Sequence, residues 1–295
     1  MFLRSSDTNL FTVGTRLYLM DEFASYPWRY KKFLYVASSK KKDETDRSMF
    51  GIHEVPTMVE GGGFDYLDPN SGYSKTYTHT TYGVGLKWSK EADEDELYGF
   101  FAKFPSYINK AARFTIETQG ANVLNNGFTD TGPDASSLFA TDHPSIGADQ
   151  ANRPSTDIDL GFTSLQAGLV NISNQDTWEG HPIDDTEQKT LWIHPDNRPQ
   201  AVKLLGSSKQ AFTGDNTMNY LEDSVSLGIN PYISTAASWF LIGKPRNGGL
   251  MWFWRVQPYV WTDFDPDTLA KRIRIRMRFS QGYTEWHGNY GTSGT

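Results

Sequence analysis

The six histidines are the first residues to examine for chemistry, because the chain contains no cysteine. His143, His181 and His194, together with Asp142, carry imidazole and carboxylate groups of the kind that bind zinc and related metals. Their spacing matches no compact ligand pattern, and each of these three histidines precedes a proline. The sequence therefore predicts no metal site. A soluble metal-dependent hydrolase that uses His143 and His194 stays only as an alternative.

The motifs of nucleophilic and nucleotide chemistry are missing from the chain. It contains no Gly-x-Ser-x-Gly elbow, no Gly-x-x-x-x-Gly-Lys phosphate loop and no dinucleotide fingerprint. Gly61, Gly62 and Gly63 are followed by Phe64 and an aspartate rather than by a helix, so they do not predict an anion site at a helix start. We therefore expect a protein that is not an enzyme and needs no cofactor.

The clearest chemical pattern lies in residues 271–279, where apolar residues and arginines alternate. Such alternation predicts a β-strand with one apolar face and one cationic face. The apolar face carries Ile273, Ile275, Met277 and Phe279, and the other carries Arg272, Arg274, Arg276 and Arg278. Guanidinium groups pair with carboxylates and phosphates. We favour ion pairs, within the subunit or to a neighbour, over direct contact with DNA.

The composition restricts the class of protein. The net charge of −7 argues against a protein that grips nucleic acid with its whole surface. Aromatic residues make up 14% of the chain, which favours broad contacts with other proteins. The N-terminus lacks the pattern of a secretory signal, and no window of residues is apolar enough to span a membrane. We expect a soluble protein without membrane contact, made inside the cell.

A long helix is predicted over residues 106–126. Its apolar residues recur mostly at the helical spacing of three and four, which indicates one buried stripe. Pro105 precedes the helix and Gly127 follows it, as expected for its two ends. A helix of this length measures about 30 Å, roughly the width of a small domain. It therefore has the length to organise the elements around it.

A long hairpin is predicted ahead of this helix. Two strand-like segments, residues 50–55 and 75–88, flank a glycine-rich centre at 60–72. The outer half has no aliphatic face, and an isolated two-stranded ribbon is only marginally stable in water. We therefore expect the ribbon to lie on another subunit, the alternative being a hairpin that packs on its own domain. The candidate inter-subunit contacts are Gly61, Gly62, Gly63, Phe64, Tyr66, Lys75, Tyr77 and the four arginines.

The remaining segments are less distinctive. Residues 38–47 form a charged run that we expect to be a solvated loop, or an arm that orders only against a neighbour. Residues 127–160 are predicted to be a long loop. A short helix is expected within 89–103, and residues 161–243 are expected to be mixed α/β. In that mixed stretch we predict a helix capped by Thr163, a helix at 196–205, and strands at 189–194, 224–229 and 239–242.

The order of these elements resembles that of the tailed-bacteriophage major capsid proteins with the HK97-type fold. The segments 82–91, 138–144 and 277–290 look like their counterparts in that family, although none is specific alone. The resemblance implies an α+β fold. Its parts would be an N-arm at 1–48, an extended loop (E-loop) at 49–88 and an axial domain at 145–245. The peripheral domain would comprise 89–144 and 246–295, with the spine helix at 106–126.

The resemblance also implies partners. Hexamers and pentamers of the chain would form an icosahedral shell around double-stranded DNA, with assembly in the host cytoplasm and a final place in the virion. A separate scaffolding protein, a portal and a cement or decoration protein are the other expected partners, and contact with the packaged DNA would be non-specific. An encapsulin-like compartment of the same fold is the main alternative. An extracellular β-rich binding module is disfavoured.

Overall fold

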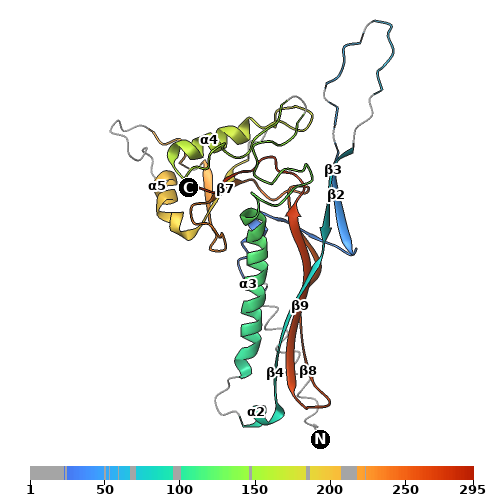
Figure 1. Ribbon diagram of the computed structural model, residues 1–295, viewed down its shortest axis with the longest axis vertical. Helices are drawn as coiled ribbons and strands as arrows, with labels where there is room; N and C mark the ends of the chain where they lie inside the picture. Colours follow the sequence, from blue (N-terminus) through green and yellow to red (C-terminus); the bar gives the residue numbers. More distant parts are fainter. Residues whose placement is uncertain are drawn as a thin grey trace.

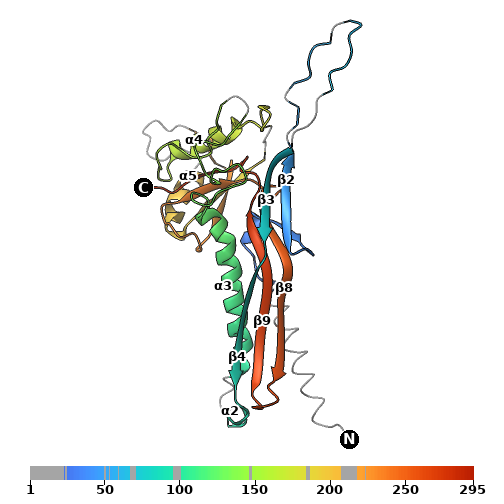
Figure 2. The same cartoon turned by 45° about the vertical axis from the view of Figure 1, so that its right-hand side comes forward.

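The computed structural model has an elongated body, a smaller rounded body and a projecting loop (Figures 1 and 2). The α3 helix, Phe104–Asn125, runs along the elongated body. The structure describes residues 23, 25–49, 51–52, 54–58, 60–66, 71–95, 101–145, 148–183, 187–206, 218–222 and 224–295. Residues 1–22 of the predicted arm lie outside this description.

The elongated body is built on a four-stranded sheet in the order β1-β8-β9-β4. The strand β1 pairs parallel with β8, whereas β8–β9 and β9–β4 are antiparallel. Their bounds are β1 Tyr35–Ser38, β4 Thr80–Trp88, β8 Leu250–Phe264 and β9 Lys271–Tyr283. The predicted alternation of β9 is confirmed, because its apolar residues are buried: Ile273, Ile275, Met277 and Phe279.

The predicted long helix is confirmed as α3, which begins at Phe104, two residues earlier than expected. Its buried stripe, which includes Ile108 and Ile116, shares one core with the apolar face of the sheet. A 3-10 turn at Tyr30–Lys32 packs on the same helix. Gly120 lets this turn approach, because a Cβ there would lie 2.6 Å from the Cβ of Tyr30.

The smaller body contains a second sheet in the order β10-β7-β5-β6 with its own core. Its strands are β5 Lys189–Ile193, β6 Val225–Ile229, β7 Trp239–Ile242 and β10 Tyr290–Thr292, and its helices are α4 Phe162–Ser173 and α5 Arg198–Leu205. A 3-10 turn at Pro195–Asn197 precedes α5. The predicted strands and helices are confirmed here. The predicted cap Thr163 is wrong, because α4 begins after Gly161, whose N–H donates to the Ser164 Oγ at 2.8 Å.

The hairpin differs from the prediction in its strands. The strand β2, Asp43–Met49, pairs antiparallel with β3, Ser71–Thr78. The loop predicted over the charged run at 38–47 is therefore wrong for residues 43–47, which lie in β2, whereas residues 39–42 are outside any strand. The described residues among 50–55 are not in a strand. The predicted second arm divides at His79, after which β4 joins the main sheet. The polar side chains of β2 gave no hydrophobic period, although its backbone can still pair.

Two shorter segments complete the description. The helix α2 spans Lys90–Glu94, and the Ser89 Oγ accepts from the Ala92 N–H at its start, so the helix predicted within 89–103 is short. A 3-10 turn follows at Phe101–Lys103. Residues 127–160 form turns and isolated bridges in their described part, as expected for a loop. No helix among the described residues has the length and apolar character needed to cross a bilayer.

Candidate inter-subunit surfaces

The connection between β2 and β3 projects beyond both bodies (Figure 2). Its described residues include apolar side chains that are almost fully exposed, with Val55 at 92% and Tyr66 at 93%. Phe64 and Met58 are also exposed, and the glycines Gly61, Gly62 and Gly63 lie in the same exposed stretch. Exposed apolar area that gathers in one place commonly marks a protein interface. We call residues 51–66 the projecting loop.

The base of the projecting loop is held by the smaller body. The Gly51 N–H donates to the Glu179 carboxylate, and the His181 Nε2 lies 3.1 Å from the Ile52 carbonyl oxygen. Burial opposes ionisation of Glu179, but hydrogen bonds from the Gly51 backbone and the Thr177 side chain hold the pKa of its carboxyl below the ordinary value. An ionised Glu179 therefore fixes the point at which the loop leaves the body.

Tyr77 anchors the β2–β3 hairpin to the main sheet. Its hydroxyl lies 2.6 Å from the Thr284 Oγ1, which in turn donates to the Asp46 Oδ2 at 2.8 Å. The ring packs on Phe253 with centroids 5.0 Å apart, and burial raises the pKa of the phenol. The prediction of Tyr77 as an inter-subunit contact is wrong, because the side chain is buried within its own chain at 3% exposure.

His79 sits where the hairpin joins the main sheet. Its Nε2 lies 3.0 Å from the Ser39 Oγ and its Nδ1 lies 3.0 Å from the Ser280 Oγ. Burial, followed by the charge of Arg278, lowers the pKa of the imidazole. The Ser39 Oγ also donates to the Glu44 carboxylate at 2.7 Å. These contacts tie His79, between β3 and β4, to β9 through Ser280 and, through Ser39 just after β1, to Glu44 of β2.

The four arginines of β9 divide into two groups. Arg272 makes two 3.0 Å contacts to the Asp263 carboxylate, and Arg274 also donates to Asp263. These two guanidinium groups therefore form ion pairs within the chain. Arg278 donates to the His79 carbonyl oxygen at 3.4 Å, and Arg276 is exposed opposite Gly83. Arg276 is therefore the most accessible cation of the four.

Lys75 is also engaged within its own chain. Its Nζ donates to the Thr131 carbonyl oxygen at 2.8 Å and lies 5.8 Å from the centre of the Tyr283 ring. It lines a polar cavity of about 340 Å³ that also includes Asn122 and Asp130. The sequence predicts Lys75 as an inter-subunit contact together with residues of the projecting loop. In the structure its side chain contacts residues of its own chain outside that loop. Its observed role is to hold β3 beside the end of α3.

The histidines with metal-binding side chains have other partners in the structure. His143 is fully buried, with its Nδ1 2.7 Å from the Asp134 Oδ2 and its Nε2 3.2 Å from the Asn152 Oδ1. Its ring stacks on Trp286 at 4.1 Å. The His194 Nδ1 lies 3.3 Å from the Asp196 carboxylate. Among the described residues, no group of three or more histidine, aspartate or glutamate side chains is placed to hold a metal ion.

Comparison with protein families identifies the chain. Residues 72–289, well over half of its length, match the family described as phage capsid protein. The chain belongs to the phage capsid protein family. It is a major capsid protein, a subunit of the virion shell, and the resemblance found in the sequence is confirmed. A comparison with curated proteins gave no match for this capsid protein.

Solved phage capsids share the fold of this capsid protein at low sequence identity. The capsid of bacteriophage JBD30 is 13% identical with a TM-score of 0.60, over 72% of this chain and 92% of that one. The capsid of cyanophage P-SCSP1u is 8% identical with a TM-score of 0.62, over 89% of this chain and 86% of that one. The procapsid of JBD30 is 13% identical with a TM-score of 0.55, over 100% and 77%. These values show a common fold.

The sequence missed two contact candidates of the capsid protein, Val55 and Met58. Both lie in the projecting loop and are exposed, although the sequence predicts a strand over 50–55 and nothing for Met58. The available signal was the lack of a sustained apolar alternation around them. Met58 has no apolar residue two or four positions away, and Val55 has only Val59 at such a spacing. Such residues have no core to join within their own segment.

Proposed function

We propose that this capsid protein assembles as hexamers and pentamers into an icosahedral shell around double-stranded DNA, in the manner of the HK97-type fold. The projecting loop is the E-loop and lies on a neighbouring subunit. The observation that carries this proposal is the exposure of Val55, Phe64 and Tyr66 on a segment with no core of its own. Burying that area on a neighbour stabilises the contact by roughly 25 cal/mol per Å².

The same proposal assigns the other parts of the chain. The α3 helix is the spine helix of a peripheral domain at 89–144 and 246–295, and the smaller body at 145–245 is the axial domain. Residues 1–48 are the N-arm and residues 49–88 the E-loop, but β2 at Asp43–Met49 supplies the first strand of the hairpin. This boundary supports an E-loop that starts within the predicted N-arm.

The proposed partners beyond the chain itself are a separate scaffolding protein, a portal and a decoration protein, with assembly in the host cytoplasm. A solved JBD30 capsid is decorated with minor capsid protein trimers, so decoration occurs on a shell of this fold. An encapsulin-like compartment would share the fold but not the packaged genome. The nucleic acid content of purified particles separates these two shells.

The test is a variant that removes the apolar side chains of the projecting loop. Replacing Val55, Met58, Phe64 and Tyr66 together by serine leaves the exposed loop polar without touching the hairpin root. We expect folded capsomers or subunits that melt like the parent but form no shells in electron micrographs. The matched control, Phe64→Leu with Tyr66→Phe, keeps the loop apolar and should form shells. Normal shells from the serine variant would refute the E-loop assignment.

A further inference from the structure

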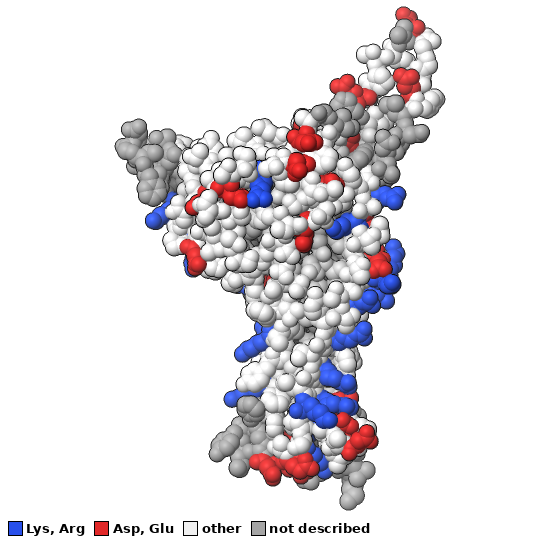
Figure 3. Space-filling model, viewed as in Figure 1, with Lys and Arg blue, Asp and Glu red and all other residues white. Residues whose placement is uncertain are grey.

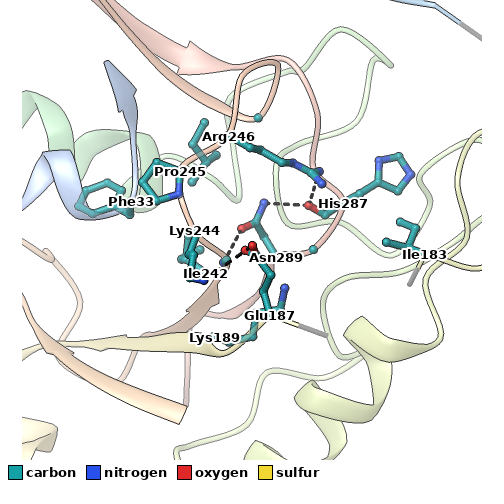
Figure 4. A pocket seen from close by; sticks show the side chains of 14 residues that line it. Phe33, Ile183, Glu187, Lys189, Ile242, Lys244, Pro245, Arg246, His287 and Asn289 are labelled. Carbon is teal, nitrogen blue, oxygen red and sulfur yellow. Dashed lines mark hydrogen bonds and ion pairs between the residues drawn. The ribbon is translucent and has the colours of Figure 1, made fainter. Parts of the chain in front are cut away.

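The cavity at the joint between the two bodies is lined by charged groups that have partners within the chain (Figure 4). The Arg246 guanidinium donates to the His287 carbonyl oxygen at 2.8 Å and lies 3.6 Å from the Glu285 carboxylate. The Lys244 Nζ lies 3.7 Å from the Glu187 carboxylate. The charges of this cavity are thus satisfied inside the subunit.

A second cavity, of about 450 Å³, lies between the segment before β1 and one face of the smaller sheet. Its floor is formed by β5 and β6, where Thr190 is opposite Ser226 and Trp192 is opposite Gly228. Gly228 leaves room for the indole beneath it, because a Cβ there would lie 2.7 Å from the Trp192 ring. The floor thus offers two hydroxyl groups and carries no charge.

The charges in the wall of this second cavity are all positive. Arg29 and Lys32 line it, and no carboxylate is among its lining residues. The Lys32 side chain is exposed and has no hydrogen-bond or ion-pair partner among the described residues. The Arg29 guanidinium donates to the Tyr26 hydroxyl at 3.3 Å, which is an uncharged partner. Two cations that share a small space favour an anion between them.

The positive charge continues along α3. Lys110, Arg113 and Glu117 share one face of this helix, since positions three or four apart are neighbours. The Arg113 guanidinium lies 5.1 Å from the centre of the Tyr26 ring, and the Arg29 N–H donates to Glu117, so this face meets the segment before β1. Lys110 is exposed, about 10 Å along the axis from Glu117, and its side chain has no partner among the described residues. We call the set Lys110, Arg113, Arg29 and Lys32 the basic track.

Glu117 does not balance the basic track. It is the only acidic residue of α3 and is 1% exposed. Burial raises the pKa of its carboxyl, although the backbone hydrogen bond and the charge of Arg29 act in the opposite direction. When Glu117 is set against Arg29, the charges of Lys32 and Lys110 still have no counterpart among the described residues. The track therefore offers net positive charge to a partner from outside the chain.

We propose that the basic track binds the backbone phosphates of double-stranded DNA, with one phosphate in the cavity beside Lys32 and others along α3. The inference rests on the proposed function, in which the shell encloses such DNA. A duplex carries one charge per about 1.7 Å of its axis, so cations spaced along a line meet phosphates in any register. The hydroxyls of Thr190 and Ser226 lie in the same cavity, and such groups commonly donate to phosphate oxygens. Contacts to the backbone alone do not depend on base sequence.

The experiment measures the binding of a short DNA duplex of mixed sequence to the unassembled full chain, by fluorescence anisotropy at several chloride concentrations. The parent should bind, and the logarithm of its affinity should fall linearly with the logarithm of the salt concentration. Lys32→Gln with Lys110→Gln removes two phosphate contacts. The slope should become shallower by about 2 and the affinity at low salt should fall about tenfold. Lys40→Gln with Lys203→Gln, two exposed lysines outside the track, is the matched control and should bind like the parent.

Three results would overturn the basic track as a DNA surface. One is a parent chain that does not bind the duplex at low salt. Another is an equal loss in both double variants, which would indicate general attraction to surface charge. The third is binding of poly-glutamate as tight as that of the duplex, with the same loss in the Lys32 and Lys110 variant, which would assign the track to an acidic protein. Shell formation is read separately in electron micrographs. A parent that forms no shells refutes the proposed function, whereas a parent that forms shells but does not bind the duplex overturns the track alone.

Discussion

At the scale of single residues, burial sets the ionisation of His287. Burial lowers the pKa of its imidazole to about 3, with further lowering by Arg246 and His143, while Asp134 acts in the opposite direction. The ring stacks on Trp286 at 4.0 Å, and His287 is 4% exposed. A histidine that is neutral when folded but ionises near its ordinary pKa when unfolded makes stability depend on pH.

The sign of that dependence follows from the depressed pKa. The contribution of His287 is fully present above the unfolded pKa of about 6.5, and it falls as the pH drops toward the folded pKa. At about pH 5 the loss is ~2 kcal/mol. Denaturant titrations in phosphate-free buffers should show that His287→Phe, which keeps a ring on Trp286, is less sensitive to acid than the parent. His181→Gln, at an exposed histidine, should keep the acid sensitivity of the parent, and equal slopes for all three proteins would contradict the prediction.

At the scale of elements, the segment before β1 is fixed to α3 by two residues of the helix. Glu117 is buried and accepts from the Arg29 N–H at 2.9 Å, and burial raises the pKa of its carboxyl although the contact to Arg29 opposes this. Three positions further along the helix, Gly120 receives Tyr30. The Glu117–Arg29 hydrogen bond and the packing of Tyr30 on Gly120 thus lie about one turn apart on the same face of α3.

Gly120→Ala tests this contact, because two effects of opposite sign compete. Alanine is favoured over glycine in a helix by about 1 kcal/mol. The new methyl would lie 2.6 Å from the Cβ of Tyr30, and overpacking of this kind costs about 1–3 kcal/mol. We expect the clash to win, with net destabilisation of roughly 1 kcal/mol in chemical denaturation. Gly161→Ala, whose methyl would meet only the Ser164 Oγ at 3.5 Å, is a control for adding a methyl without a clash, although at the residue before α4 rather than inside a helix. A Gly120→Ala protein more stable than the parent would show that the turn does not pack here.

The sequence predicts correctly those helices and strands that bury one face and leave the other in solvent. The predicted alternation in β9 and the predicted apolar stripe of α3 are both confirmed, because each element has one face in the core. The strand β2 was missed, since its side chains are polar on both faces and only backbone pairing with β3 shows that it is a strand. Tyr77 was misassigned for a related reason. Its burial depends on Phe253 and Thr284, which lie far along the chain and which no local pattern could bring to it.

At the scale of the whole molecule, charge and apolar area are distributed unevenly. Acidic residues occur on the projecting loop, whereas Lys and Arg follow the edge of the elongated body (Figure 3). The loop carries exposed Glu54, Glu60 and Asp65 beside its apolar side chains. Such a loop offers a neighbour both apolar area and negative charge. Complementary charge steers association more than it adds affinity, so assembly should slow as salt is raised.

The absence of cysteine from the sequence allows a direct test of where the loop lies after assembly. Tyr66 is 93% exposed, so Tyr66→Cys introduces one accessible thiol in the projecting loop. We expect this thiol to react rapidly with a maleimide in unassembled subunits and at least tenfold more slowly in intact shells, because a neighbouring subunit then covers it. Shells dissociated in denaturant are the internal control and should regain the fast rate. Equal rates in shells and free subunits would place the loop in solvent and leave its apolar side chains unexplained by assembly.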